Sequence, residues 1–364
     1  MAKHKRILMA GNEAIAEGAI QAGCGFYAGY PITPQNELTA YMAEEMPARG
    51  RVFIQAEAEV AAINMVYGAC AAGVRAMTSS SSPGISLKQE GISYIAGAEL
   101  PAVIVDVMRA GPGLGNIWPS QADYFQAVKG GGHGDYRLLV LAPSTAQECY
   151  DFMFDAFAKA DLYRNPVMIL ADGLLGQMME PVVVRSQEFI VDSNKLPTMN
   201  YQLPTDKPWA LTGCKGRKAN IVKSFYMIEG DLEKFNLVLQ KKYSLIREKE
   251  QRFEEVLMDD AQVVLVAYGS MSRIAKGAVK RLRQSGVRAG LIRPISLWPF
   301  PDKAFAGHLQ KGVRYLAIEM SFGQMVEDVR LAVNGKCPVD FLGKSGGGIP
   351  GEEEIVNEVK RLMR

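Results

Sequence analysis

The sequence has few cysteines, and none of them is spaced for chemistry. Five occur in 364 residues, and no two of them form a C-x-x-C pair. Neither a disulfide framework nor an iron–sulfur cluster motif is therefore encoded in this chain. Unpaired cysteine usually behaves as a small core residue, so we expect five free, buried thiols. They are Cys24, Cys70, Cys149, Cys214 and Cys337.

Long apolar runs and a strong charge of one sign are also missing. No run approaches the roughly 18 residues that span a bilayer, and the first residues lack the apolar stretch of a signal peptide. The 41 Lys and Arg against 39 Asp and Glu leave a formal charge of +2, too weak to favour nucleic acid or an anionic membrane as a partner. We expect a globular cytoplasmic protein that binds neither.

Short apolar runs alternate with helical patterns along two parts of the chain, which is typical of an α/β fold with mostly parallel sheets. Residues 183–258 interrupt the alternation and include a charged helical run, Asp231–Val256. The sequence therefore predicts a first domain at 1–185, a connector with one long charged helix at 186–258, and a smaller α/β domain at 259–364. The predicted strands are Phe26–Tyr30, Val52–Gln55, Ala76–Ser79, Ala102–Val107, Leu138–Leu141, Val167–Leu170, Val263–Ala267, Ala289–Ile292, Tyr315–Glu319 and Val339–Leu342.

Unusual loops follow four predicted strands, at the end of a parallel sheet where ligands bind. Thr33 lies between two prolines, in either a rigid ligand loop or a plain turn. Glu59 opens a helix of small residues, where it does chemistry or merely complements the helix dipole. Arg109 precedes a Gly-Pro turn and either pairs with a carboxylate or is solvated; the glycine spacing there does not fit a dinucleotide site. His133 lies among glycines, as a ligand-loop or a structural residue.

Together these segments resemble the α subunit, or the equivalent fused region, of the 2-oxoacid:ferredoxin oxidoreductases. The similarity spans nearly the whole chain. It is closest to the branched-chain type, which acts on 3-methyl-2-oxobutanoate, notably in Ala56–Met65 and Ser79–Ser86. Relatives that use 2-oxoglutarate share most of the motifs. The matching segments are Tyr30–Pro34, Glu57–Gly73, Val105–Arg109, Gly131–Asp135, Tyr268–Ser270 and Arg293–Pro301.

The resemblance implies that residues 1–185 form a domain that binds the pyrimidine ring of thiamine diphosphate, and that the last part is similar to the transketolase C-terminal domain. In this family the activating acid precedes an alanine by three residues and a glycine by nine. Glu59 meets both spacings, with Ala62 and Gly68, whereas Glu57 meets neither. Such a glutamate, bonded to N1′ of the ring, favours the tautomer that removes the thiazolium C2 proton.

The same resemblance implies roles for the other candidates. Arg109 and Thr33 match positions that contact the carboxylate and oxo groups of the substrate. We expect Ile32 and His133 beside the substrate as well, with His133 ordering the loop over it. The expected cofactor contacts are Glu59, Pro31 and Ser82.

Two parts of such an enzyme are missing from the sequence. The diphosphate end of the cofactor needs a G-D-G…N motif to hold Mg²⁺, and [4Fe–4S] centres need clustered cysteines, and neither occurs here. No metal ligand is therefore expected on this chain. The resemblance implies a β subunit that carries the Mg²⁺ site and an iron–sulfur cluster and shares the thiamine diphosphate. Small γ and ferredoxin-like δ subunits, ferredoxin and coenzyme A are further expected partners, and the expected products are acyl-CoA, CO₂ and reduced ferredoxin.

Three questions remain open at this stage. A 2-oxoglutarate:ferredoxin oxidoreductase α subunit needs a second cation for the distal carboxylate, and Lys88 and Lys129 are either that cation or solvated helix residues. A second alternative is an assembly subunit that kept the fold and lost catalytic activity. The presence of Glu59 and Arg109 argues against it, because such a subunit would not need them. The loop Arg293–Pro301 either lines the coenzyme A site or packs against the first domain, and its apolar side chains favour packing.

Overall fold

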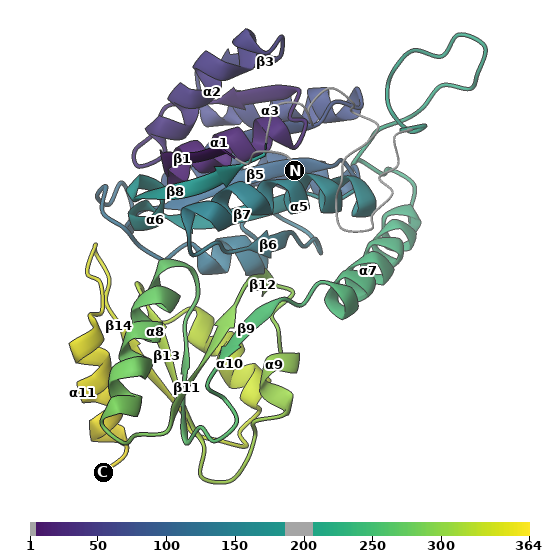
Figure 1. Cartoon of the computed structure of the whole chain (residues 1–364). Helices are drawn as coiled ribbons and strands as arrows, with labels where there is room; N and C mark the ends of the chain where they lie inside the picture. Colours follow the sequence, from purple (N-terminus) through teal and green to yellow (C-terminus); the bar gives the residue numbers. More distant parts are fainter. Residues whose placement is uncertain (1–4, 186–206) are drawn as a thin grey trace.

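A sheet of seven strands forms the first half of the molecule (Figure 1). The computed structural model describes residues 5–185 and 207–364. The strands are β2 (Phe26–Gly29), β3 (Val52–Gln55), β4 (Ala76–Ser80), β5 (Ala102–Met108), β6 (Leu139–Leu141), β7 (Val167–Asp172) and β12 (Ser296–Trp298). Their order is β12-β6-β7-β5-β4-β2-β3, and all pairs are parallel except β12 with β6. Strands β4, β5 and β7 are buried along their whole length, as parallel strands covered on both faces are.

Helices connect these strands and cover the sheet. They are α1 (Gly11–Gln21), α2 (Asn36–Ala48), α3 (Glu59–Ala71), α4 (Ser82–Gly97), the short π-helix η1 (Gln126–Gly130), α5 (Ala146–Tyr163) and α6 (Gly173–Gln177). α1 packs against α2 and α5, and α3 packs against α4. Two further strands, β1 (Lys5–Ala10) and β8 (Met179–Val184), pair as a separate antiparallel ribbon that the sequence patterns did not predict.

A second sheet of five strands forms the other half, in the order β14-β13-β10-β11-β9. Its strands are β9 (Phe253–Val256), β10 (Val263–Val266), β11 (Ala289–Pro294), β13 (Arg314–Glu319) and β14 (Val339–Gly343). The helices of this half are α8 (Gly269–Gln284), α9 (Lys303–Ala306), α10 (Met325–Val333) and α11 (Glu352–Leu362). The predicted α/β fold class is confirmed, and every predicted strand is present with ends that differ by at most two residues.

The long charged helix ends earlier than predicted. α7 (Asp231–Lys249) stops at Lys249, and the last predicted residues form β9 instead, antiparallel to β11. Glu250 explains the end of the helix, because its buried carboxylate accepts a hydrogen bond from Tyr163 of α5 at 2.6 Å and pairs with Lys159. Backbone pairing with a neighbouring strand then overrides the weak helix preference of a charged segment. Residues 186–206 of the predicted connector lie outside the described residues, and the three-part division stays a prediction.

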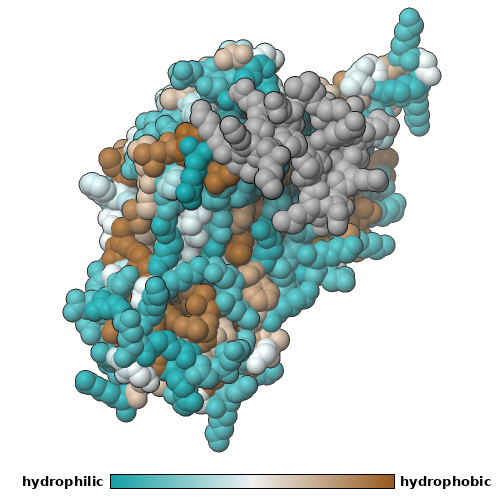
Figure 2. All heavy atoms as spheres, in the orientation of Figure 1, coloured by the Kyte–Doolittle hydropathy of each residue, from teal (hydrophilic) through white to brown (hydrophobic). Residues whose placement is uncertain are grey.

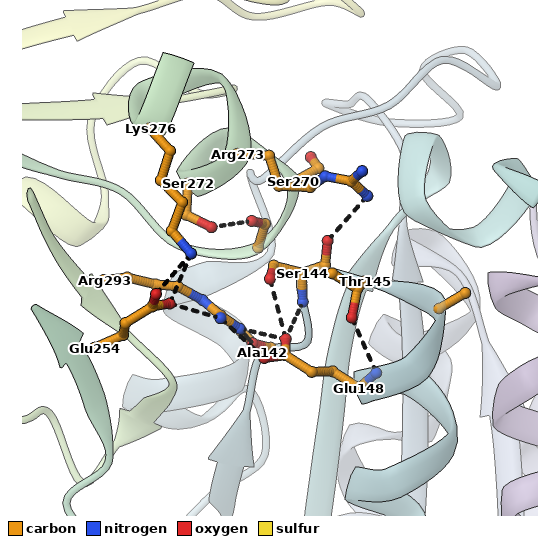
Figure 3. A network of polar contacts seen from close by, with 12 residues as sticks. Ala142, Ser144, Thr145, Glu148, Glu254, Ser270, Ser272, Arg273, Lys276 and Arg293 are labelled. Carbon is orange, nitrogen blue, oxygen red and sulfur yellow. Dashed lines mark hydrogen bonds and ion pairs between the residues drawn. The ribbon is translucent and has the colours of Figure 1, made fainter. Parts of the chain in front are cut away.

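β12 and a set of ion pairs join the two sheets, and Figure 3 shows the polar part of this junction. The side chain of Arg293 is 3% exposed. Its Nη1 donates to Glu148 of the first half at 2.9 Å and to Glu254 of the second half at 3.2 Å. The prediction that Arg293–Pro301 packs against the first half is confirmed, since Trp298 belongs to β12 and is buried.

The surface is mixed in character. Polar side chains cover most of the face in Figure 2, and apolar patches lie between them. None of the described helices combines the length and the apolar character that a bilayer crossing requires.

Four of the five cysteines are buried free thiols, as predicted, but Cys214 is exposed. The prediction is wrong for Cys214 because it lies in an irregular polar stretch that faces solvent. Burial raises the pKa of both Cys24 and Cys70 to about 12, so these thiols stay protonated.

Candidate active site

Arg109 and the Thr33 loop meet where β2 and β5 end. Both strands flank β4, so the loops that follow them lie at one edge of the sheet. Arg109 is 7% exposed, and its Nη1 donates to the Thr33 carbonyl at 3.0 Å. Nη2 donates to the carbonyl of Leu114 at 2.9 Å, and Nε is buried without a partner in the described chain. Arg109 therefore brings to this edge a positive charge that no ion pair with a described carboxylate neutralises.

Ser82 ties the start of α4 to the backbone of Arg109. The Arg109 N–H donates to the Ser82 hydroxyl at 3.0 Å, and this hydroxyl donates to the Asp123 carboxylate. The Ser82 N–H donates to Asp106 Oδ1 at 3.2 Å. These bonds hold Ser82 at a φ of +24°, which is unfavourable for a residue with a side chain. The hydroxyl is thus used within the chain, and its predicted contact with a cofactor stays a prediction.

Glu59 is the first residue of α3, and it is 6% exposed. No hydrogen bond or ion pair joins its carboxylate to any described residue. Gly84 of α4 lies directly against it, since an added Cβ would come to 2.6 Å from Glu59 Oε1 and 2.1 Å from Ser80 Oγ. Glu57, two residues earlier, is exposed. A buried carboxylate without a partner is costly and is typical of a site that a ligand completes.

Lys88 of α4 is fully buried. Its ammonium donates to Thr78 Oγ1 at 2.8 Å and to the Ser79 carbonyl at 2.9 Å. Burial lowers the pKa of Lys88 to about 7, while the negative charge of Glu59, and that of Asp106 when it is ionised, acts in the opposite direction. The interpretation of Lys88 as a solvated helix residue is therefore wrong. The helix turns it inward because positions 84, 88 and 92 share one face, and the whole of that face is buried.

Two buried carboxyl groups, Asp106 of β5 and Asp123, lie beside this lysine and Ser82. Burial raises the pKa of Asp106 well above its ordinary value, and the charge of Asp123 and a hydrogen bond between the two groups raise it further. Burial also raises the pKa of Asp123, while bonds from Ser82 and Gln126 lower it. The pair therefore holds a proton on Asp106, and the negative charge resides on Asp123.

An open cleft runs beside Arg109 between the two halves of the molecule. Ser82 and Arg109 line it on one side, and Phe322 and Gln324 line it on the other. Phe322 is 83% exposed, so the cleft has an apolar outer wall. Among the described residues that line this cleft, Arg109 is the only cation.

The other predicted site residues are not gathered at this cleft. His133 is exposed in the loop after η1, and it does not line the cleft. Pro31 is exposed and Ile32 is half-buried, both in the Thr33 loop. Their contacts with substrate and cofactor stay predictions. Lys129 pairs with Asp328 at 2.5 Å.

The sequence patterns missed Asp106 and Asp123, and they named Lys88 only as a possible cation for a second substrate carboxylate. Asp106 carried a signal, because it is the one acid in a fully buried strand of otherwise apolar residues. Asp123 lies in an irregular segment and had no such signal.

Family models match most of the chain. Residues 17–225, more than half of it, match the thiamine-diphosphate-binding domain of the pyruvate flavodoxin/ferredoxin oxidoreductases. Residues 261–355 match core domain II of pyruvate:ferredoxin oxidoreductase. The chain belongs to this family. The family resemblance expected from the sequence motifs is thereby confirmed.

Individual relatives agree with the family models. The ketoisovalerate oxidoreductase subunit VorB of Methanothermobacter marburgensis is 50% identical over 98% of this chain and 97% of its own length. The 2-oxoglutarate synthase subunit KorA of Methanothermobacter thermautotrophicus is 37% identical over 97% of this chain and 98% of its own length. The solved 2-oxoglutarate:ferredoxin oxidoreductase from Magnetococcus marinus, with 2-oxoglutarate, coenzyme A and succinyl-CoA bound, is 28% identical with a TM-score of 0.84. That match covers 99% of this chain and 66% of the solved chain.

The residues at the sheet edge fit the pyrimidine end of the family's cofactor. The Glu59 carboxylate is buried and has no partner in the described chain, so it is available to a ring nitrogen that carries a proton. Gly84 lets α4 approach this carboxylate more closely than any residue with a side chain would allow. Among the described residues, no group of His, Cys, Asp and Glu is arranged to hold a metal ion.

Proposed function

We propose that this chain is a subunit of a thiamine-diphosphate-dependent 2-oxoacid:ferredoxin oxidoreductase that converts 3-methyl-2-oxobutanoate and coenzyme A to acyl-CoA, CO₂ and reduced ferredoxin. The observation that carries the proposal is the buried, unpartnered carboxylate of Glu59 within the part that matches the family's cofactor domain. The relative at 50% identity, named a ketoisovalerate oxidoreductase subunit, supports the branched-chain substrate.

In this proposal Glu59 activates the cofactor. Its carboxylate accepts a hydrogen bond from the protonated N1′ of the pyrimidine ring and so stabilises the tautomer whose 4′-nitrogen acts as a base. The close approach of Gly84 on α4 limits the positions that the carboxylate can take. When bound, thiamine diphosphate supplies the nucleophilic carbon and the electron sink of the reaction.

Arg109 and Thr33 bind the substrate in the same proposal. The guanidinium of Arg109 uses one proton each of Nη1 and Nη2 on backbone carbonyls, so its remaining N–H groups are available to a carboxylate. The Thr33 hydroxyl accepts a hydrogen bond from Asn36 at 3.1 Å and keeps its own proton for the oxo oxygen. Together they hold both polar ends of a 2-oxoacid.

A partner chain completes the active site. The sequence lacks the Mg²⁺ motif and the clustered cysteines that this reaction requires. We therefore propose a β subunit that holds Mg²⁺, the diphosphate end of the cofactor and a [4Fe–4S] cluster, with γ and ferredoxin-like δ subunits completing a cytoplasmic complex.

The charges of the site favour a branched-chain acid over 2-oxoglutarate. A second carboxylate needs a second cation, and the two candidates from the sequence are both engaged. Lys88 is buried against β4, and Lys129 is paired with Asp328. Arg109 is the only cation among the described residues that line the cleft. The 2-oxoglutarate reaction remains the second candidate, because a 2-oxoglutarate synthase subunit is 37% identical and the solved 2-oxoglutarate enzyme shares the fold.

Substrate-dependent reduction of a low-potential dye tests this proposal. The purified complex is assayed with thiamine diphosphate, Mg²⁺ and coenzyme A, and 3-methyl-2-oxobutanoate is compared with 2-oxoglutarate. We expect a kcat/KM at least tenfold higher for the branched acid, because a pocket with one cation leaves the distal carboxylate of 2-oxoglutarate unpaired. The reverse preference would assign the 2-oxoglutarate reaction, and reduction with neither acid would contradict the proposed activity.

A further inference from the structure

Lys88 lies one helical turn beyond the glycine that contacts Glu59. Gly84 and Lys88 are four residues apart on α4, so their side-chain positions share one face. Helical side chains lean toward the start of their helix, which directs Lys88 toward Gly84. Because an added Cβ on Gly84 would meet both Glu59 and Ser80, this face of α4 points at the activating carboxylate.

The ammonium of Lys88 has one proton without an acceptor, and the carboxylate of Glu59 accepts no hydrogen bond from a described residue. Two of its three protons go to Thr78 Oγ1 at 2.8 Å and to the Ser79 carbonyl at 2.9 Å. No hydrogen bond or ion pair reaches Glu59 in the described chain, and the hydroxyl of Ser80 is buried without a partner. The two charged groups are therefore close enough to interact electrostatically without being bonded to each other.

Three acids face Lys88 or its neighbours: Glu59 from α3, Asp106 from β5, and Asp123, which is hydrogen-bonded to Asp106. Burial and the charge of Asp123 keep Asp106 protonated. Asp123 has other bonds, from Ser82 and Gln126. The acid left to balance the charge of Lys88 is Glu59.

We propose that Lys88 is a positioning residue for Glu59, and that the attraction of its buried ammonium holds the Glu59 carboxylate in the orientation that accepts a hydrogen bond from the pyrimidine ring of the cofactor. This inference rests on the proposed function, because it needs Glu59 to be the activating acid. Lys88 touches neither the substrate nor the cofactor and acts only through Glu59.

The proposal predicts that the effect of Lys88 on Glu59 depends on pH. Since burial lowers the pKa of Lys88 to about 7, the side chain is charged below this pH and neutral above it. Its influence on Glu59 is therefore present on the acid side of pH 7 and fades on the alkaline side. A purely structural role would have no such dependence.

The test compares wild type with Lys88→Met in the assembled complex, because methionine has a similar length and no charge. The dissociation constant of thiamine diphosphate with Mg²⁺, and kcat for the 2-oxoacid, are measured from pH 6 to pH 8.5. We expect binding and turnover in the variant to be about tenfold weaker at pH 6, where the lost charge attraction is fully present in wild type, and to approach the wild-type values by pH 8.5. An equal loss at every pH, or no loss at pH 6, would overturn the proposal.

Lys242→Met is the matched control. Lys242 is a partly buried lysine of α7 that pairs with Glu99 at 2.9 Å, and burial lowers its pKa as well. We expect a ratio to wild type near one at every pH. If Lys88→Met fails to assemble, Thr78→Val keeps the charge but removes one of its anchors, and a smaller loss with the same pH dependence is expected.

Glu59→Gln, measured in parallel, separates the two claims. Lost turnover in Glu59→Gln together with an unchanged Lys88→Met variant would remove only the role of Lys88. Unchanged turnover in Glu59→Gln would remove the proposed function itself.

Discussion

At the scale of single residues, the site depends on charges that the fold leaves without a direct ion pair. Glu59 and Arg109 are both buried, yet neither pairs with a described residue of opposite charge. Other buried acids have partners within the chain: Asp161 pairs with Arg75 and Lys207, each at 2.8 Å, and Glu319 accepts hydrogen bonds from three backbone N–H groups of residues 324–326. Unpaired buried charges are unfavourable, so their presence at one edge of the sheet indicates selection for a ligand rather than for stability.

Arg109→Gln tests the substrate contact. We expect kcat/KM for the 2-oxoacid to fall about 100-fold, as loss of a charged hydrogen bond worth about 3 kcal/mol predicts, while the affinity for thiamine diphosphate changes little. Steady-state kinetics and titration of the cofactor measure the two effects. Arg217→Gln, at an exposed arginine far along the chain, is the control. An unchanged KM and kcat in Arg109→Gln would contradict the assigned role.

At the scale of elements, the sequence predicts what burial dictates. β5 and β7 are continuous apolar runs, and both were predicted because strands buried on two faces leave that pattern. β9 and β12 were missed, because each is short and pairs at the edge of a sheet with a strand far away in the sequence. The sequence pattern within such a short strand does not indicate which distant strand it pairs with.

The candidate site also contains residues that the sequence predicted and residues that it did not. Arg109 and Thr33 were predicted from loops that follow strands, and the structure brings them into contact. The inward turn of Lys88 depends on which face of α4 meets β4, and this packing is not written in the local sequence. His133 had the features of a ligand loop, but the structure of this chain leaves it exposed.

Gly84→Ala tests the close approach of α4 to α3. The added methyl group would come within 2.6 Å of Glu59 and 2.1 Å of Ser80, so the carboxylate must move. We expect turnover to fall at least about tenfold, since displacing a reactive group by a fraction of an ångström is costly. Gly307→Ala, where an added Cβ meets nothing within 4 Å, is the control for the substitution itself. Equal activity of both variants would show that Glu59 tolerates displacement.

At the scale of the whole molecule, the two halves are joined by a shared β-sheet as well as by side-chain contacts. β12 leaves the second half and adds a strand to the first sheet, and Arg293 bridges Glu148 and Glu254 across the junction (Figure 3). The cleft beside Arg109 is lined from both halves. The relative position of the two halves therefore determines the shape of the site.

Arg293→Met tests this junction. Burial raises the pKa of Glu148, but its bonds to Arg293 and Ser144 outweigh burial and leave the pKa below the ordinary 4.5. The ion pair therefore contributes stability above pH 4.5 that is lost as the pH falls further. We expect the variant to lose about 3 kcal/mol of unfolding free energy at pH 7, and the difference from wild type to shrink below pH 4.5. Denaturant titration measures both, with exposed Arg361→Met as the control; a loss that is equal at every pH would contradict the electrostatic origin.

We propose that this chain supplies the activating carboxylate, Glu59, of an active site that it shares with a partner chain. The most direct test is substrate-dependent dye reduction by the assembled complex with Glu59→Gln, compared with Glu57→Gln, which alters an exposed glutamate two residues away. We expect Glu59→Gln to lower kcat at least about 100-fold, because glutamine cannot stabilise the protonated ring, and Glu57→Gln to retain most of the activity. Wild-type turnover in a correctly assembled Glu59→Gln complex would contradict it.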